Sequence, residues 1–254
     1  GNFPIRLYGI FFSLGIISGC ITAYFLLKKD RRGWESHMFD LGLVIAFAGI
    51  VGGRLWDVFF FDWEYYHNHL LEIPYIWQGG MAIQGGIIFA CIAAYFYLKK
   101  HQIPVLPFAD TVTPGIILGQ AIGRIANFMN GDAFGHPTGQ DFGLLYPDTT
   151  LAYHTYGAQP LWPAEVWECQ GDLLIFVLLL WYGCKTRTEG TTFCLYIMFY
   201  SLLRFFLENY RGDYGTLALG LKSAQLTSLA AFAGAFILFL YFHFKHKSKS
   251  GISE

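Results

Sequence analysis

Residues 115–135 have the composition of a membrane helix, but polar side chains interrupt them. Gln120, Arg124, Asn127 and Asn130 lie there among apolar residues. On a helix, Gln120, Arg124 and Asn127 follow an i, i+4, i+7 spacing and share one face. An arginine inside a bilayer costs at least about 2.5–3.5 kcal/mol on insertion scales. We therefore expect Arg124 to recover this cost through a group that it binds.

Two further groups of polar side chains recur at helical spacing near the ends of apolar stretches. One group follows i, i+4, i+8, i+11 and contains Tyr200, Arg204, Glu208 and Arg211. The other follows i, i+3, i+7 and contains Glu165, Glu168 and Asp172. The simplest interpretation is a buried network in which carboxylates and arginines hold helices together. The alternative is a ligand site, because the amides and the phenol beside Arg124 and Arg204 suit the oxygens of a ligand.

Arg54 and Asp57 lie three residues apart in another apolar stretch. This spacing places them on one face of a helix, so we expect them to pair with each other in a structural role.

Small residues form a second pattern. The strip Gly119, Gly123 and Ala126, next to the face of Arg124, is typical of helices that approach closely.

The overall composition indicates a polytopic membrane protein. Hydrophobic residues make up 54% of the chain and charged residues only 14%, whereas a soluble domain carries roughly 25% charged residues. The net charge of −1 and the lack of a basic tract give no support to nucleic-acid binding. The eight histidines and five cysteines show no metal-ligand spacing, so we expect no metal and no cofactor.

Seven apolar segments are long enough to cross a membrane as helices. They run over residues 5–27, 39–61, 79–98, 108–130, 164–184, 190–207 and 223–244. We see no internal repeat and no linker between domains. The sequence therefore predicts a single all-α integral membrane domain over residues 1–254.

The basic residues predict how this domain is oriented. Eleven of the seventeen Lys and Arg residues lie on alternate connections between the segments. They are Lys28, Lys29, Arg31, Arg32, Lys99, Lys100, Lys185, Arg187, Lys245, Lys247 and Lys249. The positive-inside rule makes these connections cytoplasmic, with the N-terminus in the periplasm and the C-terminus in the cytoplasm. We then expect the loop 131–163 to form a small periplasmic head and the tail 245–254 to be disordered.

The sequence GRIANFMNGDAFG at 123–135 resembles the signature of the prolipoprotein diacylglyceryl transferases, a family of bacterial inner-membrane enzymes. The resemblance spans essentially the whole chain. Its other elements are Tyr8-Gly9, GGRL at 52–55, GGMAIQGG at 79–86, PAEVWE at 163–168, YSLLRFFLENYR at 200–211 and SAQLTS at 223–228.

The chain departs from the family pattern at three places. Asp132 stands where the family usually has a glutamate, and Gln84 stands where a histidine is often found. The segment usually written His-Pro-x-Gln-x-Tyr-Glu reads WPAEVWE here, from Trp162 to Glu168. Because Gln84 replaces a candidate base, a histidine-based mechanism is in doubt for this protein.

The resemblance implies transfer of a diacylglyceryl group from phosphatidylglycerol to the lipobox cysteine of a prolipoprotein signal peptide. The product is a thioether, glycerol phosphate leaves, and the reaction takes place among the membrane lipids of the bacterial inner membrane. Arg124 and Arg204 would stabilise the departing phosphate, with Tyr200 and Glu208 orienting them. The groups expected to hold the lipid are Arg124, Asn127, Asn130, Tyr8, Gln84 and Asp132. Those expected to support the site are Arg54, Asp57, Glu165, Glu168 and Arg211.

Two other functions fit some of these features. A catalytically silent homologue would bind lipid or signal peptides without chemistry, which the changes at Gln84 and Trp162 allow. A transporter of an anionic solute would also use membrane arginines. The lack of a two-fold repeat disfavours the transporter, because many transporters are built from such repeats.

Overall fold

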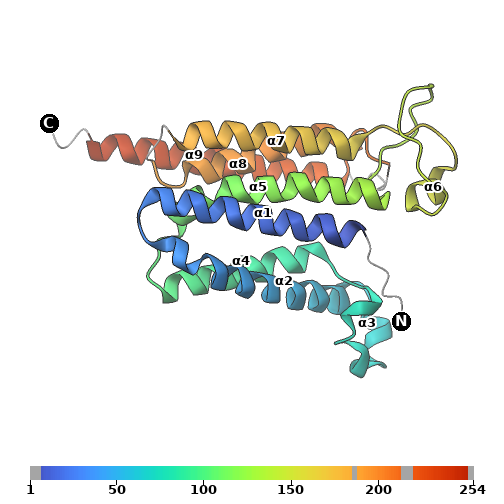
Figure 1. Ribbon diagram of the computed structural model, residues 1–254, viewed down its shortest axis with the longest axis horizontal. Helices are drawn as coiled ribbons and strands as arrows, with labels where there is room; N and C mark the ends of the chain where they lie inside the picture. The colour runs from blue at the N-terminus through green and yellow to red at the C-terminus, as the bar shows by residue number, and fades with distance from the viewer. Residues whose placement is uncertain (1–6, 185–187, 213–219, 251–254) are drawn as a thin grey trace. The chain divides into compact units, whose positions relative to one another are not determined.

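A computed structural model describes residues 7–184, 188–212 and 220–250 of the chain. All regular secondary structure in these residues is helical, and the pairings between extended segments are isolated bridges. Figure 1 shows the arrangement of the helices. They are α1 (Leu7–Asp30), η1 (Trp34–His37), α2 (Met38–Phe60), α3 (Trp63–Tyr66), η2 (Leu70–Glu72), η3 (Ile76–Gln78), α4 (Ile83–Lys100), α5 (Val105–Asn130), α6 (Leu151–Tyr156), α7 (Ala164–Gly183), α8 (Thr191–Leu207) and α9 (Ser223–Ser250).

A long helix lies in each of the seven predicted segments. Within the described residues, four helical stretches are long and apolar enough to cross a membrane: Leu7–Asp30, Trp34–Phe60, Val105–Asn130 and Ser223–Lys245. The helix α8 is apolar but shorter, and α7 carries three acidic residues. Seven crossings and their orientation therefore stay predictions. Lys185 and Arg187, two of the eleven basic residues that predicted the orientation, lie outside the described residues.

The last helix extends further than the sequence indicated. The predicted seventh segment ends at residue 244, whereas α9 continues to Ser250, into the tail that we expected to be disordered. Residues 251–254 of that tail lie outside the described residues.

The chain forms two compact units, and the single domain predicted for residues 1–254 stays a prediction. The first unit contains the described residues up to Lys29 and from Ala109 onward, and the second unit contains Asp30–Phe108. In the first unit, glycines bring α1 close to α5. A Cβ atom on Gly15 would lie 2.8 Å from the carbonyl oxygen of Gly119, and one on Gly19 would lie 2.7 Å from that of Gly115. Close packing at Gly119 agrees with the predicted strip of small residues.

The other members of that strip differ. Ala126 is fully buried, but a Cβ atom on Gly123 would meet no atom within 4 Å among its described neighbours.

Elsewhere in the first unit, α8 packs against α7 and α9. An apolar cluster of Ile117, Ile175 and Leu179 joins α5 to α7, and residues of α8 pack against it. This cluster fixes the three helices that carry the polar stripes.

The loop 131–163 has a small core of its own. Phe134, Ala152 and Leu161 are buried in it, and Tyr156 packs against them. Figure 1 shows this loop, with α6, beyond the ends of α5 and α7. The loop therefore forms a compact head, and its placement in the periplasm stays a prediction.

In the second unit, Arg54 holds the connection between α2 and α4. Its guanidinium donates hydrogen bonds to the carbonyl oxygens of Ile73 (2.7 Å), Gly79 (2.7 Å), Gly80 (2.9 Å) and Glu72 (3.1 Å). Arg54 itself is 97% buried, so these carbonyls replace the water that its charge loses. Backbone carbonyls are thus the main partners of Arg54, and its structural role stays a prediction.

The predicted pair of Arg54 with Asp57 is present at a long distance. The nearest nitrogen and oxygen atoms are 3.9 Å apart. Gly80 lies against both side chains with a φ of +72°, and a Cβ atom there would lie 2.6 Å from Nη1 of Arg54. Only glycine fits this backbone conformation and this space without strain.

The contact between α2 and α4 gives a stability prediction. A Cβ atom on Gly52 would lie 2.5 Å from the carbonyl oxygen of Gly85 and would overlap Phe89. We expect Gly52→Ala to lower the free energy of unfolding by about 1–3 kcal/mol, because an overpacked contact must move apart. Thermal unfolding in detergent measures this effect. Gly49→Ala on the same helix is the matched control, since a Cβ atom there would lie 3.7 Å from its nearest neighbour, the carbonyl oxygen of Gly86. Equal melting temperatures for the two variants would contradict the close contact.

Candidate functional site

Three helices meet around the carboxylate of Glu168, which is fully buried on α7. Its Oε1 lies 2.8 Å from Nη2 of Arg124 on α5. Its Oε2 lies 3.4 Å from Nη1 of Arg204 on α8 and 3.5 Å from Nη1 of Arg211. The hydroxyl of Tyr200 donates to Oε1 over 3.4 Å. One carboxylate therefore joins the three stripes that the sequence indicated.

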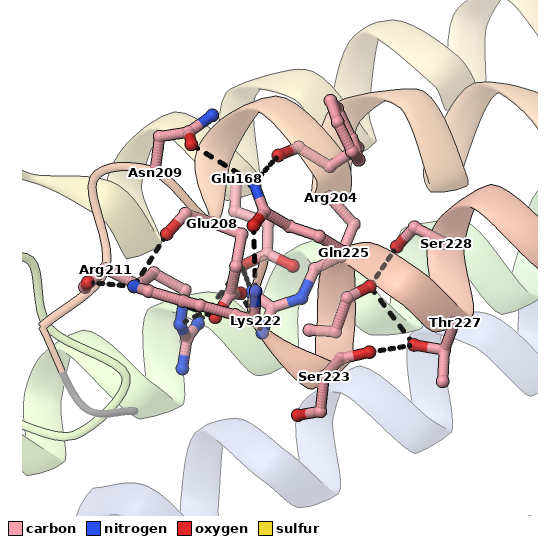
Figure 2. A network of polar contacts seen from close by, with 12 residues as sticks. Glu168, Arg204, Glu208, Asn209, Arg211, Lys222, Ser223, Gln225, Thr227 and Ser228 are labelled. Atoms are coloured by element: carbon pink, nitrogen blue, oxygen red, sulfur yellow. Dashed lines mark hydrogen bonds and ion pairs between the residues drawn. The ribbon is translucent and has the colours of Figure 1, made fainter. Parts of the chain in front are cut away.

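A second buried carboxylate, Glu208, lies at the end of α8 (Figure 2). Its Oε2 is 2.8 Å from Nη2 of Arg204, one helical turn earlier, and 4.0 Å from Nε of Arg211. Arg204 thus lies between Glu168 and Glu208. Since both carboxylates are fully buried, the geometry fixes the plane of the Arg204 guanidinium.

Lys222 is a member of this cluster to which we assigned no role from the sequence. Its ammonium donates hydrogen bonds to the carbonyl oxygens of Glu208 (2.9 Å) and Arg211 (2.5 Å), as Figure 2 shows. Carbonyls at the carboxyl end of a helix lack partners within the helix, so a cation stabilises them there. Gln225 supports the same end, because its Nε2 donates to Oδ1 of Asn209 over 3.1 Å. The sequence offered one indication of this role: Lys222 is a lysine that does not belong to the alternate basic connections.

The end of α5 carries a chain of amide contacts. Nη1 of Arg124 donates to Oδ1 of Asn127 over 3.3 Å, and Nδ2 of Asn127 donates to Oδ1 of Asp132 over 2.6 Å. Asn130 donates to the other oxygen of Asp132 over 2.7 Å. Tyr8 on α1 is partly buried and interacts electrostatically with Asp132 and Arg124. The structure therefore brings the predicted lipid-binding residues of this unit together.

The backbone after α5 also reaches the end of α8. Gly135 and Arg211 form an antiparallel bridge, and the amide of His136 donates to the carbonyl of Tyr210 over 2.9 Å. The amide of Gly212 donates to the carbonyl of Phe134 over 3.1 Å. The last residues of the signature motif therefore fix the position of Arg211.

Glu165 and Asp172 behave differently from Glu168, although all three lie on one face of α7. Both side chains are fully buried, and neither carboxylate has a hydrogen-bond partner among the described residues. Their interaction with the arginines is electrostatic and at longer range: Glu165 interacts with Arg211, and Asp172 interacts with Arg124 and Arg204. We expected the acidic residues Glu165, Glu168 and Asp172 to pair with the arginines, and only Glu168 among them contacts the arginines directly.

Gln84 lies in the second unit, in the first turn of α4, and is exposed. Arg54 and Asp57 belong to the same unit, and Arg54 holds its 62–80 connection. The remaining site residues from the sequence belong to the first unit.

Arg124 and Arg204 keep part of their guanidinium groups available to a ligand. Their side chains are 20% and 14% exposed, whereas Glu168 between them is fully buried. The Nε of Arg124 is buried and has no hydrogen-bond partner among the described residues, so an anion would contact the exposed part of the guanidinium. A guanidinium carries five N–H donors, so both arginines can bind an oxygen-rich anion while Glu168 holds them.

Apolar helices long enough to cross a membrane and a buried arginine cluster between helices define a multi-pass membrane protein with a polar internal site. The family model for prolipoprotein diacylglyceryl transferase matches residues 1–241 of the chain. The chain belongs to this family of transferases.

Several relatives are similar over almost the whole chain. Phosphatidylglycerol–prolipoprotein diacylglyceryl transferase of Staphylococcus saprophyticus is 36% identical over 233 residues, which cover 90% of this chain and 82% of the relative. The protein of the same name from Clostridium botulinum is 36% identical, with 90% and 89% covered. The one from Halalkalibacterium halodurans is 33% identical, with 95% and 83% covered.

The position of Glu168 gives a second prediction. Glu168→Gln removes the charge that three arginines share, and removing one partner of a buried ion pair costs about 3–5 kcal/mol. We therefore expect a large fall in melting temperature in detergent together with a loss of activity. Glu189→Gln, at an exposed glutamate before α8, is the control that should leave both unchanged. An inactive Glu168→Gln protein with an unchanged melting temperature would instead indicate a direct chemical role.

Proposed function

We propose that this protein transfers the diacylglyceryl group of phosphatidylglycerol to the thiol of the lipobox cysteine in a prolipoprotein. Membership of the family and the names of its relatives support this proposal. The observation that carries it is the pair Arg124 and Arg204. These two guanidinium groups come from different helices, contact the same carboxylate and keep part of their surface exposed.

The reaction exchanges one bond at the lipid's glycerol carbon. The sulfur of the cysteine attacks the carbon that carries the phosphate, a C–S bond forms, and the C–O bond breaks. The electron pair of the broken bond leaves with the phosphate oxygen, so glycerol phosphate departs with one more negative charge. The proton of the thiol passes to Asp132 or to the departing phosphate. Arg124 and Arg204 lower the barrier because they stabilise the charge that develops on that phosphate.

The other residues bind and orient the lipid. Asn127, Asn130 and Tyr8 hold the headgroup hydroxyls or phosphate oxygens, and Tyr200 orients Arg124 through the hydrogen bond of 3.3 Å between them. Gln84 donates a hydrogen bond to the substrate. Lys222 positions Arg211 and Glu208 and does not touch the lipid.

The proposed function includes the finer topology. Seven helices cross the bacterial inner membrane, with the N-terminus and the head 131–163 in the periplasm. This places the arginine cluster near the outer end of α5 and α8, at the level of the phospholipid phosphates. A lipid substrate explains why the polar groups lie between helices and not in a separate soluble domain.

One assay separates this function from its rivals. Purified protein is incubated with radiolabelled phosphatidylglycerol and a lipobox peptide, and label on the peptide is measured. Transfer supports the proposal. Binding of the lipid without transfer would favour the catalytically silent homologue, and uptake of an anion into vesicles without transfer would favour the transporter.

Arg124 gives the third prediction. Arg124→Lys keeps the charge but loses the rigid fork that binds two oxygens at once. We expect kcat/KM to fall more than about tenfold, the loss of a hydrogen bond to a charged group. Arg32→Lys, at an exposed arginine, should leave the rate unchanged. The assignment of Arg124 to the phosphate fails if Arg124→Ala keeps a turnover within about twofold of the wild type.

The fourth prediction is that no imidazole of this protein acts as the base for the thiol. His154 is exposed on α6, and Nδ1 of His136 is bonded to the carbonyl of Pro137 over 2.9 Å. The profile of kcat/KM against pH reports ionisations of the free enzyme and free peptide. It should rise with the acceptor thiol, near pH ~8.5 or lower, without a separate limb near ~6.5. A limb near ~6.5 that disappears in His136→Gln or His154→Gln would show that a histidine is the base.

A further inference from the structure

A second polar pair lies one helical turn from Arg124 on the same face of α5. The hydroxyl of Tyr196 donates to Oε1 of Gln120 over 2.8 Å. Tyr196 also stacks on Tyr200, with ring centroids 6.2 Å apart, and Tyr200 is bonded to Arg124 over 3.3 Å. Two polar connections thus join α5 to α8, about 6 Å apart along the helix axis. The mechanism above uses only the connection that contains Arg124.

The polarity of this face falls in one direction along α5. The amides of Asn127 and Asn130 come first, at the end next to the head, and the charged Arg124 follows one turn further in. Gln120 with Tyr196 is next, and it carries no charge. Beyond it lies the apolar cluster that begins at Ile117.

A phospholipid has the same order of groups. Its polyol headgroup is followed by a charged phosphate, then by uncharged ester carbonyls, and then by acyl chains. If the phosphate binds Arg124, the glycerol backbone places an ester carbonyl at a distance comparable to one helical turn. This is the level of Gln120.

The chemistry of the pair suits an ester in particular. Since Oε1 of Gln120 accepts the hydrogen bond of Tyr196, the NH₂ on the other side of the amide is free of that contact and offers two N–H donors. Gln120 is partly exposed, so this donor is accessible. An ester carbonyl is only an acceptor and therefore complements it. An ether lipid lacks the carbonyl.

We infer that Gln120, held by Tyr196, forms a subsite for an ester carbonyl of the diacyl lipid. The inference rests on the part of the proposed function that places the phosphate of the lipid at Arg124, and not on the transfer step. The subsite sets how deeply the lipid lies along α5, and so positions the glycerol carbon beside the arginines. It selects diester over diether lipids.

The test compares phosphatidylglycerol with its 1,2-di-O-alkyl analogue of the same headgroup and chain length. In wild-type protein we expect kcat/KM to be about three- to tenfold higher for the diester, the effect of one neutral hydrogen bond. Gln120→Met keeps the length of the side chain without its donor, so it should lower the diester rate by this factor and leave the diether rate unchanged. Tyr196→Phe should reduce the preference partly. Gln170→Met, at an exposed glutamine on α7, is the matched control and should keep the full preference.

The outcomes separate the subsite from the proposed function. Transfer from both lipids with a diester preference that survives in Gln120→Met overturns the subsite and leaves the proposed function intact. An equal fall of both rates in Gln120→Met also overturns it, because it indicates general disruption. Native mass spectrometry of the purified protein with both lipids measures which lipid it binds better. This measurement tests the preference for the diester without requiring transfer. If no transfer occurs but the competition shows a preference that depends on Gln120, the proposed function fails and the subsite stands. If no transfer occurs and the competition shows no preference, both the proposed function and the subsite fail.

Discussion

The internal site depends on the buried carboxylate of Glu168. Three arginines placed between apolar helices would repel one another and would each lose the water that solvates them. Glu168 offsets part of this cost, because its two oxygens lie within 3.5 Å of guanidinium nitrogens from Arg124, Arg204 and Arg211. It draws together α5, α7 and the end of α8. The same carboxylate cannot neutralise all three charges, and Glu208 shares Arg204 and Arg211 with it.

The protein contains two different environments for an arginine in an apolar region. Arg54 is surrounded by backbone carbonyls that satisfy its donors and is 97% buried, so it holds one loop in place. Arg124 has side-chain partners from several helices, keeps one nitrogen without a hydrogen bond among the described residues, and is partly exposed. This contrast is the reason for proposing Arg124, and not Arg54, as an arginine that binds the substrate. Residue type alone does not separate the two.

Helical spacing in the sequence predicted much of this arrangement, because it depends on short distances along the chain. It placed Arg124 with Asn127 on one face and Arg204 with Glu208 on another, and both pairs are in contact. It could not show that Glu168 and not Asp172 is the shared carboxylate, since that choice depends on how α7 is rotated against its neighbours. The carbonyls around Arg54 and the role of Lys222 were also inaccessible, because backbone groups look alike at every position of a sequence.

The ion pair between Arg124 and Glu168 has a consequence for the synthesis and membrane insertion of the protein. A ribosome synthesises α5 before α7, and membrane helices enter the bilayer in the order of synthesis. Arg124 therefore reaches the membrane while the carboxylate that will neutralise it has not yet been translated. The cost of an arginine in a bilayer, at least about 2.5–3.5 kcal/mol on insertion scales, is therefore offset by Glu168 only after α7 has been synthesised.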